Sequence, residues 1–374
     1  MLGYVLDEVF LDHHAPSGHP ERPARATAAR DALLATGITK VGLHVAVRAP
    51  YDSELAAVHD GKHLEQLAKL VAGNDGWVDP DTYFSKGSWR AATSAVGATC
   101  ELALQSMAGQ ITRGVAVVRP PGHHATRDRA MGFCLLNNVA AAAAAARAAG
   151  AARVAIVDWD VHHGNGTQDI FWDDPNVMYL SVHQFPYYPG TGAPTEVGGP
   201  AALGQTLNVG LPAGAGDADY LAVAAHVFAP ALREFKPDLI LISAGFDAFV
   251  HDPIAGMTVT AGGFAALSAV MRLVADDICG GRIIAVLEGG YDLEGVGSGM
   301  AAVANVFMQP SAYGALAASA PSLAVGGNVV PLPISGGVRA ALDATATAHR
   351  PWAAWARQWP PHVPSLTVAA GALR

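Results

Sequence analysis

Five short stretches of almost uninterrupted apolar residues constrain the fold of this chain more than any other feature. They are Val115–Val118, Val154–Val157, Val177–Val182, Leu239–Ser243 and Ile283–Leu287. A strand with one face in water alternates apolar and polar residues, whereas a strand covered on both faces is apolar throughout. These stretches therefore predict strands of a parallel sheet that is buried on both sides.

Longer helix-type segments separate these strands along the chain. The expected helices are Ala91–Met107, Val139–Ala149, Tyr220–Phe235 and Gly262–Ala275. Strands that alternate with helices predict an α/β fold, an open, mostly parallel sheet with helices on both faces. With 51% hydrophobic and 15% charged residues among 374, the chain has enough apolar material for a large buried interior.

One domain is expected to span residues 1–374. No segment rich enough in proline, glycine or serine to act as a linker divides the first 308 residues. After about Gln309 the strand patterns become sparse and prolines gather, so residues 309–374 are interpreted as a C-terminal appendage that packs on the domain or mediates association. Whether the chain forms a homo-oligomer is left open.

The composition argues against several classes of partner. A formal net charge of −9 does not suit binding to a nucleic-acid backbone, which calls for a basic face. No run of about 18 strongly apolar residues indicates a membrane span, and the N-terminus lacks the pattern of a signal peptide. Three cysteines without paired spacing suit a reducing compartment. A soluble, cytoplasmic protein is therefore expected.

Potential ligands and proton carriers follow four of the five predicted strands. The sequence reads RPPGHH after the first strand, DWDVHHGNG after the second, AGFD after the fourth and EGGY after the fifth. Ligands of open parallel sheets bind beyond the carboxyl ends of the strands. The sequence therefore predicts that these four segments meet in one cleft.

Asp160, His162 and Asp247 are the predicted metal ligands. Asp160 and His162 are two residues apart, so an extended backbone directs both side chains to one side, and Asp247 can add a third ligand from another strand end. One imidazole and two carboxylates that leave positions open are typical of catalytic zinc, although Fe²⁺ and Co²⁺ also accept such ligands. Because Gly164 stands where the binuclear manganese ureohydrolases carry a further aspartate, one ion is expected. The Asp-x-His spacing alone also fits a polar loop that binds no metal.

The adjacent pair His123 and His124 predicts acid–base catalysis. Hydrolysis at a metal needs a general base for the water and a general acid for the leaving amine. Asp158 and Asn165 lie close to the metal motif in sequence and are the expected hydrogen-bond partners of the two rings. A carboxylate raises the basicity of an imidazole and an amide does not, so the two histidines are expected to differ in pKa. Two solvated loop histidines are the alternative.

Aromatic residues and glycines flank the predicted cleft. Tyr291 follows two glycines and can donate a hydrogen bond to an oxyanion that develops opposite the metal. Phe133, which follows Gly132, and Tyr188, which precedes a Pro-Gly-Thr-Gly segment, can form two walls of a narrow apolar slot for a methylene stem. Each of these aromatic residues, considered alone, could instead belong to the hydrophobic core.

Together these motifs resemble the arginase-fold histone deacetylase family. RPPGHHA, MGFC followed by NN, DWDVHHGNGTQ, SAGFDA and EGGY occur in the order in which that family has them. The sequence is most similar to the class II branch and to the histone deacetylase-like amidohydrolases, and HPERPAR at His19–Arg25 is similar to that branch as well. The similarity extends from about Val5 to Met308.

The resemblance implies a zinc-dependent deacetylase. It implies that Asp160, His162 and Asp247 bind the metal. It also implies that His123 and His124 activate a water molecule and that Tyr291 polarises the amide carbonyl. It implies that Phe133 and Tyr188 line an acyl-lysine channel and that Gly132 contacts the substrate stem. Arg25 matches an arginine near the acetate-release pocket, and Asp81 matches a rim residue that contacts the substrate backbone. A structural potassium ion is also implied, and its residues would be Asp158, Asp160, His162 and Ser181.

Two positions depart from patterns found in the family. Tyr188 stands where phenylalanine is usual and adds a hydroxyl to the channel wall, which can change acyl selectivity. Asn165 replaces the aspartate of the class I branch, although asparagine is usual in class II. Tyr291 separates the chain from the branch that carries histidine at this position and deacetylates acetyl-lysine poorly.

Two other functions stay open at this point. An acetylpolyamine amidohydrolase of the same family would need a carboxylate at the channel mouth for its cationic substrate. The polyamine-selective members have glutamate seven residues after the third metal ligand, where this chain has Ile254, but Asp252 and the negative net charge keep this alternative open. The second is a catalytically idle acyl-lysine reader or metal sensor, which would have no need of proton carriers such as His123 and His124.

Overall fold

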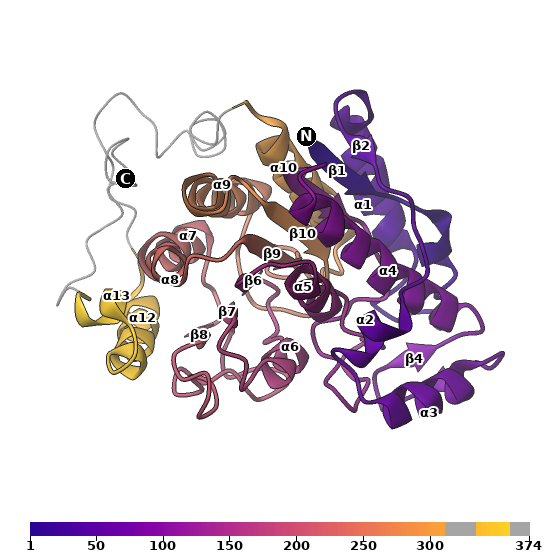
Figure 1. The fold of residues 1–374 in the computed structure, drawn as a ribbon, viewed down its shortest axis with the longest axis horizontal. Helices are drawn as coiled ribbons and strands as arrows, with labels where there is room; N and C mark the ends of the chain where they lie inside the picture. The colour runs from indigo at the N-terminus through magenta and orange to yellow at the C-terminus, as the bar shows by residue number, and fades with distance from the viewer. Residues whose placement is uncertain (311–333, 360–374) are drawn as a thin grey trace.

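The computed structural model describes residues 1–310 and 334–359. Eight parallel strands form one open sheet in the order β2-β1-β5-β10-β9-β6-β7-β8 (Figure 1). In chain order these strands are β1 (Leu2–Val5), β2 (Leu43–His44), β5 (Arg113–Ala116), β6 (Val154–Asp158), β7 (Val177–Gln184), β8 (Thr206–Leu211), β9 (Leu239–Ala244) and β10 (Ile283–Leu287). The predicted α/β fold with a parallel sheet is confirmed.

The middle of the sheet is buried on both faces, as the continuous apolar stretches predicted. In β6, Ala155 and Val157 pack into one hydrophobic core, whereas Val154 and Ile156 pack into a second core on the opposite face. Successive side chains of a strand point to opposite faces, so a strand that serves two cores needs apolar residues at every position.

Helices cover both faces (Figure 1). Against the first core lie α1 (Ala24–Ala35), α7 (Asp217–Val223), α8 (Ala229–Phe235), α9 (Ala261–Ile278) and α10 (Leu293–Met308). Against the second lie α3 (Gly61–Val71), α4 (Ser88–Met107), α5 (Asn138–Ala148) and the short α6 (Asn165–Ile170). The short α2 (Asp52–Ala56) precedes α3, and a hairpin of β3 (Gly76–Trp77) and β4 (Tyr83–Phe84) stands apart from the sheet.

The predicted elements agree with the observed ones except at some boundaries. A π-helical turn at residues 224–228 joins α7 to α8, so the single helix predicted over Tyr220–Phe235 is a continuous helical segment with a local change of winding. The strand predicted at Val115–Val118 is β5, which ends at Ala116. Val117 and Val118 are buried in the segment that continues from β5 toward the site. This burial, and not a place in the strand, explains why apolar residues occur at these two positions.

The described part of the C-terminal segment packs against the edge of the sheet at β8. Helix α12 (Gly336–His349) donates hydrogen bonds from Thr345 to the carbonyl oxygen of Asn208 and from His349 to that of Thr206. These bonds satisfy carbonyl groups of an edge strand that would otherwise face solvent. The short α13 (Ala354–Arg357) follows. Residues 311–333 and 360–374 of the predicted appendage lie outside the described residues.

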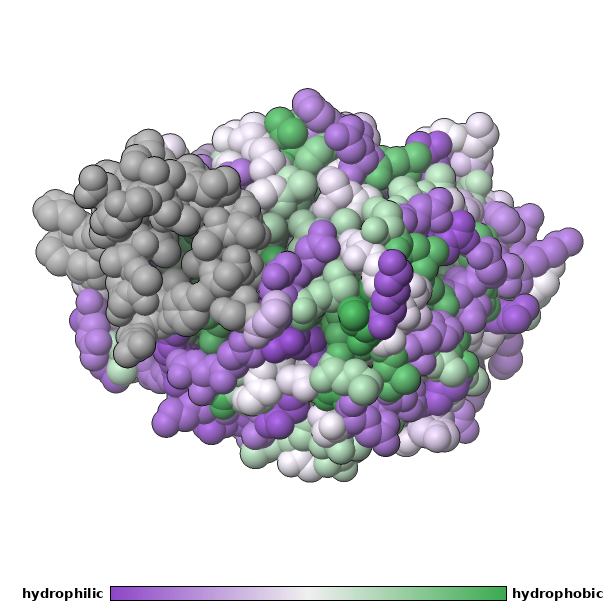
Figure 2. Space-filling view, turned by 90° about the horizontal axis from the view of Figure 1, so that it is seen from above, coloured by the Kyte–Doolittle hydropathy of each residue, from purple (hydrophilic) through white to green (hydrophobic). Residues whose placement is uncertain are grey.

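Hydrophilic and hydrophobic residues are interspersed over the face of the molecule seen in Figure 2. In the described ranges, none of the helices has both the length and the apolar character that crossing a membrane requires.

Candidate metal centre and active site

Three acidic and imidazole side chains converge beyond the carboxyl ends of β6 and β9. Asp160 and His162 follow β6, and Asp247 follows β9. His162 Nδ1 lies 3.2 Å from Asp160 Oδ1 and 3.1 Å from Asp247 Oδ2. All three side chains are buried, and their ligand atoms lie within 4.8 Å of one another. The topology thus brings together the predicted metal ligands.

The spacing and charge of this triad fit a divalent cation such as zinc. Ligand bonds of about 2.0–2.1 Å in a tetrahedron put neighbouring ligand atoms about 3.3–3.4 Å apart, close to the observed separations. Two buried carboxylates that face each other repel unless a cation lies between them. Burial and the charge of Asp160 raise the pKa of Asp247 to about 7. A bound cation would offset this repulsion and favour the ionised form of both carboxylates.

Backbone amides fix the two carboxylates. The amide of Val161 donates to Asp247 Oδ1 at 2.8 Å, and the amide of Gly289 donates to Asp160 Oδ2 at 2.8 Å. A Cβ atom at position 289 would lie 2.3 Å from Asp247 Oδ2, so only glycine allows the chain after β10 to pass this close. Gly289 of the EGGY segment therefore has a steric role at the metal centre.

His123 and His124 lie beside the triad and have different partners. His123 Nδ1 lies 3.0 Å from Asp158 Oδ2, and His124 Nδ1 lies 2.8 Å from Asn165 Oδ1. Both acceptors are oxygens, so each ring donates from Nδ1 and directs Nε2 elsewhere. The two ring centroids are 4.0 Å apart.

The two histidines also differ in pKa. Burial acts to lower the pKa of His123, but the charges of Asp160 and Asp158 outweigh it and raise the pKa to about 10. Burial, together with the charges of His123 and His162, lowers the pKa of His124 well below its usual value. Their different surroundings therefore shift the pKa values of the two rings in opposite directions.

Glu288, at the end of β10, holds the loop that carries these histidines. Its Oε2 accepts hydrogen bonds from the backbone amides of Gly122 at 2.6 Å and His123 at 3.2 Å, and its Oε1 accepts one from Ser243 at 3.1 Å. Burial raises the pKa of this carboxyl to about 7. The sequence analysis included Glu288 only as the first residue of the EGGY segment and gave it no role of its own.

Tyr291 lies on the segment that follows β10, and its ring centroid is 5.7 Å from that of Phe133 in the cavity wall. It is 8% exposed, and burial raises the pKa of its phenol well above the usual value, so the hydroxyl keeps its proton. Arg25 is fully buried behind it and donates to the carbonyl oxygens of Gly290 and Glu288. Arg25 therefore ties the start of α1 to the loop that carries Tyr291.

A narrow cavity of about 180 Å³ leads to the metal centre. The residues that line it are Asp81, His124, Gly132, Phe133, His162, Tyr187, Tyr188 and Ile254. Every substrate-contacting residue predicted from the sequence lines this cavity except Arg25, which lies behind Tyr291. A Cβ atom at Gly132 would lie 2.5 Å from the ring of His124, and its φ of 58° also favours glycine.

Two adjacent tyrosines form one wall of the cavity. The ring of Tyr188 meets His124 edge-on at 5.2 Å between centroids, and Tyr187 stacks on His162 at 5.6 Å. The hydroxyl of Tyr187 donates to the carbonyl oxygen of Ile254. Sequence reasoning missed Tyr187, and the available signal was its position next to Tyr188 before the Pro-Gly-Thr-Gly segment.

Asp81 lies at the edge of the cavity with its carboxylate partly engaged. Its Oδ1 accepts a hydrogen bond from Thr82 Oγ1 at 2.8 Å, and burial together with the neighbouring Asp79 raises its pKa. The carbonyl oxygen of Asp81 lies 3.1 Å from His19 Nε2. The loop at the rim is thus attached to the segment that precedes α1.

The residues predicted to hold potassium are also close together. Asp158 and Ser181 are directly paired neighbours on β6 and β7. Asp158 Oδ1 accepts the amide of Asp160 at 3.1 Å, and Ser181 Oγ lies 2.9 Å from His183 Nδ1. Both side chains are therefore engaged within the protein.

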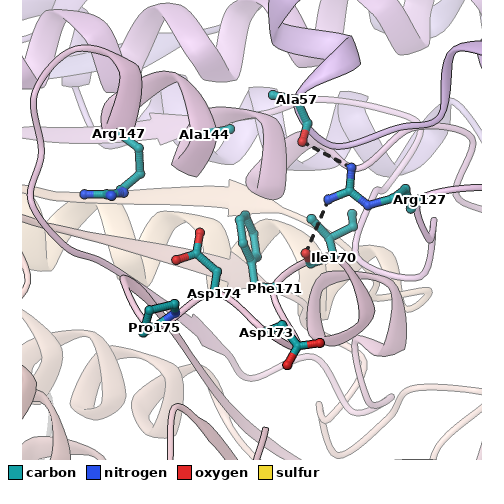
Figure 3. Close-up of a pocket in the computed structure, with 9 residues that line it drawn as sticks. All are labelled: Ala57, Arg127, Ala144, Arg147, Ile170, Phe171, Asp173, Asp174 and Pro175. Atoms are coloured by element: carbon teal, nitrogen blue, oxygen red, sulfur yellow. Dashed lines mark hydrogen bonds between the residues drawn. The ribbon is translucent and has the colours of Figure 1, made fainter. Parts of the chain in front are cut away.

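A larger hollow of about 600 Å³ lies elsewhere and has a different character (Figure 3). Its lining includes Arg127, Arg147, Asp173 and Asp174. Arg127 donates to two backbone carbonyl oxygens of neighbouring segments (Figure 3). The smaller cavity, and not this hollow, is lined by residues of the metal and histidine groups, so it is the candidate active site.

Comparisons with known proteins show what this chain is similar to in sequence and in fold. Residues 19–307 match the family described as the histone deacetylase domain. The chain is 41% identical over 295 residues to Histone deacetylase 15 of Arabidopsis thaliana, a match that covers 78% of this chain and 53% of that protein. It is 38% identical over 298 residues to a probable deacetylase of Archaeoglobus fulgidus, covering 79% of this chain and 82% of that protein. The chain thus matches about half the length of the plant relative.

A solved structure extends the likeness to the fold. The crystal structure of the HDA15 HD domain has a TM-score of 0.79 and 38% sequence identity with this chain. The match covers 85% of this chain and 95% of the solved one.

Proposed function

This chain belongs to the histone deacetylase family, and we propose that it is a zinc-dependent hydrolase of acylated amines. The substrate would be a lysine side chain, or a similar amine, that carries an acetyl or other short acyl group. The observation that carries this proposal is the convergence of Asp160, His162 and Asp247 with the pair His123 and His124 beside one narrow cavity, which His124 and His162 line.

Asp160, His162 and Asp247 would hold one metal ion. A bound zinc ion supplies Lewis acidity toward the amide carbonyl and toward water. The donor set also accepts Fe²⁺, so the identity of the ion is part of the proposal. Asp158 and its strand neighbour Ser181, together with the metal loop, would hold a potassium ion as a separate structural element.

His124 would act as the general base. Its Nδ1 proton is committed to Asn165, which leaves the lone pair of Nε2 free to accept a proton from the attacking water. The water oxygen bonds to the carbonyl carbon, the carbon–nitrogen bond then breaks, and the proton held by His124 passes to the leaving nitrogen. The products are a carboxylate and an ammonium ion, because the proton of the new carboxylic acid passes to the amine.

His123 and Tyr291 would stabilise the charge that develops in the transition state. The carboxylate of Asp158 favours the imidazolium form of His123, which supplies a positive charge beside the reacting carbonyl. The phenol of Tyr291 would donate a hydrogen bond to the oxyanion. Such donors act strongly because the site is buried and their positions are fixed before the reaction.

The cavity favours an acyl-lysine over an acetylated polyamine. Ile254 lines it with an aliphatic side chain. Asp252, the carboxylate that kept the polyamine alternative open, accepts hydrogen bonds from the backbone amides of Tyr291 and Ile254. The negative charge of Asp252 is therefore bound to backbone amides of the protein. Asp81 also lines the cavity, but its Oδ1 accepts a hydrogen bond from Thr82 and its raised pKa weakens its negative charge, so it attracts a polyamine less than a free carboxylate would.

A side-by-side assay tests the proposal. Purified protein reconstituted with zinc would be assayed with acetyl-lysine peptides, acetylated polyamines and lysine peptides carrying longer acyl chains. We expect hydrolysis of acetyl-lysine peptides, with loss of activity on chelation and recovery with zinc. Protein that binds one zinc ion and a hydroxamate inhibitor but hydrolyses none of these substrates would identify the idle reader instead.

A further inference from the structure

The loop of residues 250–256, which follows the metal ligand Asp247, is held by one buried carboxylate. Asp252 is 7% exposed. Its Oδ1 accepts the amide of Ile254 at 3.0 Å, and its Oδ2 accepts the amides of Tyr291 at 2.7 Å and Asp292 at 3.3 Å. One side chain thus connects a residue of the cavity wall with the residue that carries the phenol.

Ile254 is also held from its other side. The hydroxyl of Tyr187 donates to the carbonyl oxygen of Ile254, while the ring of Tyr187 stacks on the metal ligand His162. Both backbone polar groups of Ile254 are therefore bonded to side chains, one to Asp252 and one to Tyr187. This arrangement leaves the backbone of Ile254 little freedom to move toward or away from the cavity.

We propose that Asp252 and Tyr187 are positioning residues that together hold Ile254 and Tyr291, and that they set the preference of the site for the amine part of its substrate, an acetyl-lysine peptide or an acetylated polyamine. The proposal deepens the proposed deacylase function and rests on it. Neither residue contributes a proton to the reaction. Asp252 keeps the phenol of Tyr291 at the position from which it can donate to the carbonyl oxygen of the substrate. Asp252 and Tyr187 together fix how far the side chain of Ile254 narrows the cavity.

The chemistry of Asp252 makes the position sensitive to a small change. A carboxylate is an acceptor at both oxygens, and here three backbone N–H groups use them. The Asp252→Asn side chain would present an NH₂ group to at least one of these donors, which leaves a buried amide unsatisfied and pushes the two segments apart. A displacement of about 1 Å in a catalytic constellation can cost up to about 10²-fold in rate.

Hydrogen exchange tests, without any assay of activity, whether Asp252 holds the loop of residues 250–256 and the segment of Tyr291 together. In full-length Asp252→Asn protein, we expect faster amide exchange in segments 250–256 and 289–292 than in the unmodified protein. The matched control is Asp238→Asn, because Asp238 accepts the amide of Arg153 at 3.0 Å near the opposite ends of the strands. That control should leave exchange in both segments unchanged. Unchanged exchange in the Asp252→Asn protein would overturn the proposal.

Kinetics then test the effect on specificity. For Asp252→Asn we expect kcat on an acetyl-lysine peptide to fall at least about tenfold, and the preference for an acetyl-lysine peptide over acetylspermidine to change at least about threefold. Tyr187→Phe, which keeps the ring on His162, should change the preference in the same direction. The double variant should change it by less than the product of the two single effects, because both residues act through Ile254.

The outcomes separate this proposal from the proposed function. If the unmodified protein hydrolyses none of the acylated amines, the proposed function is refuted. Hydrogen exchange would still decide whether Asp252 holds the two segments together. An unchanged preference between acetyl-lysine peptide and acetylspermidine in both single variants, with activity lowered only as far as the fraction of folded protein is lowered, would overturn the positioning role. If Asp252→Asn protein does not fold, an unchanged preference in Tyr187→Phe protein would overturn it alone.

Discussion

The guanidinium of Arg25 lies over the ring of Tyr291, with its Cζ atom 5.0 Å from the ring centroid. Arg25 also donates to carbonyl oxygens on the segment that carries Tyr291 and forms an ion pair with Glu21 at 2.7 Å. A cation behind an aromatic ring is attracted to the face of that ring. The ring of Tyr291 is therefore fixed from behind, which is the condition for its hydroxyl to meet an oxyanion at a fixed place.

Replacing Tyr291 by phenylalanine tests that role. The ring and its contact with Arg25 would remain, so the melting temperature should change by no more than about 2 °C. Loss of one preorganised oxyanion donor should lower kcat about 10²–10³-fold. The measurements are kcat and melting temperature on the same preparation, with hydroxamate affinity as the control for an intact metal site. An unchanged kcat would exclude the oxyanion role.

Removing Asp247 tests the metal centre. Asp247→Ala leaves one carboxylate and one imidazole, which hold zinc poorly, so bound zinc should fall from about one ion per chain to near none. Elemental analysis after dialysis measures this directly, and Asp247→Asn protein serves as the matched variant that preserves side-chain volume. A full complement of zinc in the alanine variant, or two ions in the unmodified protein, would contradict the proposed site.

The strands and the positions of the reactive residues could be predicted because both depend on local sequence. Apolar residues at every position mark strands covered on both faces, and in a parallel sheet the polar residues that follow such strands meet at one edge. Edge strands carry a weaker signal. β8 includes Asn208 and Gly210, and β2 has only two residues, so neither resembles a buried central strand.

Contacts between distant loops could not be predicted in this way. Tyr187 and Ile254 are 67 residues apart, and Glu21 and Arg119 are 98 residues apart. Each contact depends on how a loop without regular structure returns to the sheet, which no periodic pattern specifies. The sequence marked Asp252 only as a negative charge near the expected channel mouth, whereas its geometry makes it an acceptor for backbone amides.

A charge at position 254 tests the substrate preference. Ile254→Glu adds a carboxylate to the cavity wall, where it can attract the distal ammonium of an acetylated polyamine. A partly exposed ion pair contributes about 0.2–1 kcal/mol, so the ratio of kcat/KM for acetylspermidine to that for an acetyl-lysine peptide should rise up to roughly fivefold. Ile254→Gln, similar in size but uncharged, is the control. An equal rise in both variants would exclude an electrostatic cause.

Glu21 forms the centre of a buried charged cluster beneath the site. Its carboxylate pairs with Arg25 at 2.7 Å, with Arg119 at 2.5 Å and with His13 at 3.2 Å, and both Glu21 and the two arginines are fully buried. Burial alone would raise the pKa of Glu21, but Arg119 and His13 outweigh it and hold the pKa well below the usual value. The cluster therefore contains an ionised carboxylate between two guanidinium groups.

Glu21→Gln should destabilise the protein in a pH-dependent way. Removing the charge leaves two buried guanidinium groups without a compensating carboxylate, which costs about 3–5 kcal/mol. Because the folded-state pKa lies below the unfolded-state value of about 4.3, this contribution is complete above that value and is lost as pH falls through the folded-state pKa. The difference in urea midpoint between unmodified and variant protein should therefore be constant from pH 8 to 6 and shrink in stronger acid.

Glu65→Gln, at a carboxylate that is 75% exposed, should shift the midpoint little at any pH. A Glu21→Gln shift as small as that control, or one that grows below pH 4, would show that Glu21 does not act as an ionised centre of the cluster.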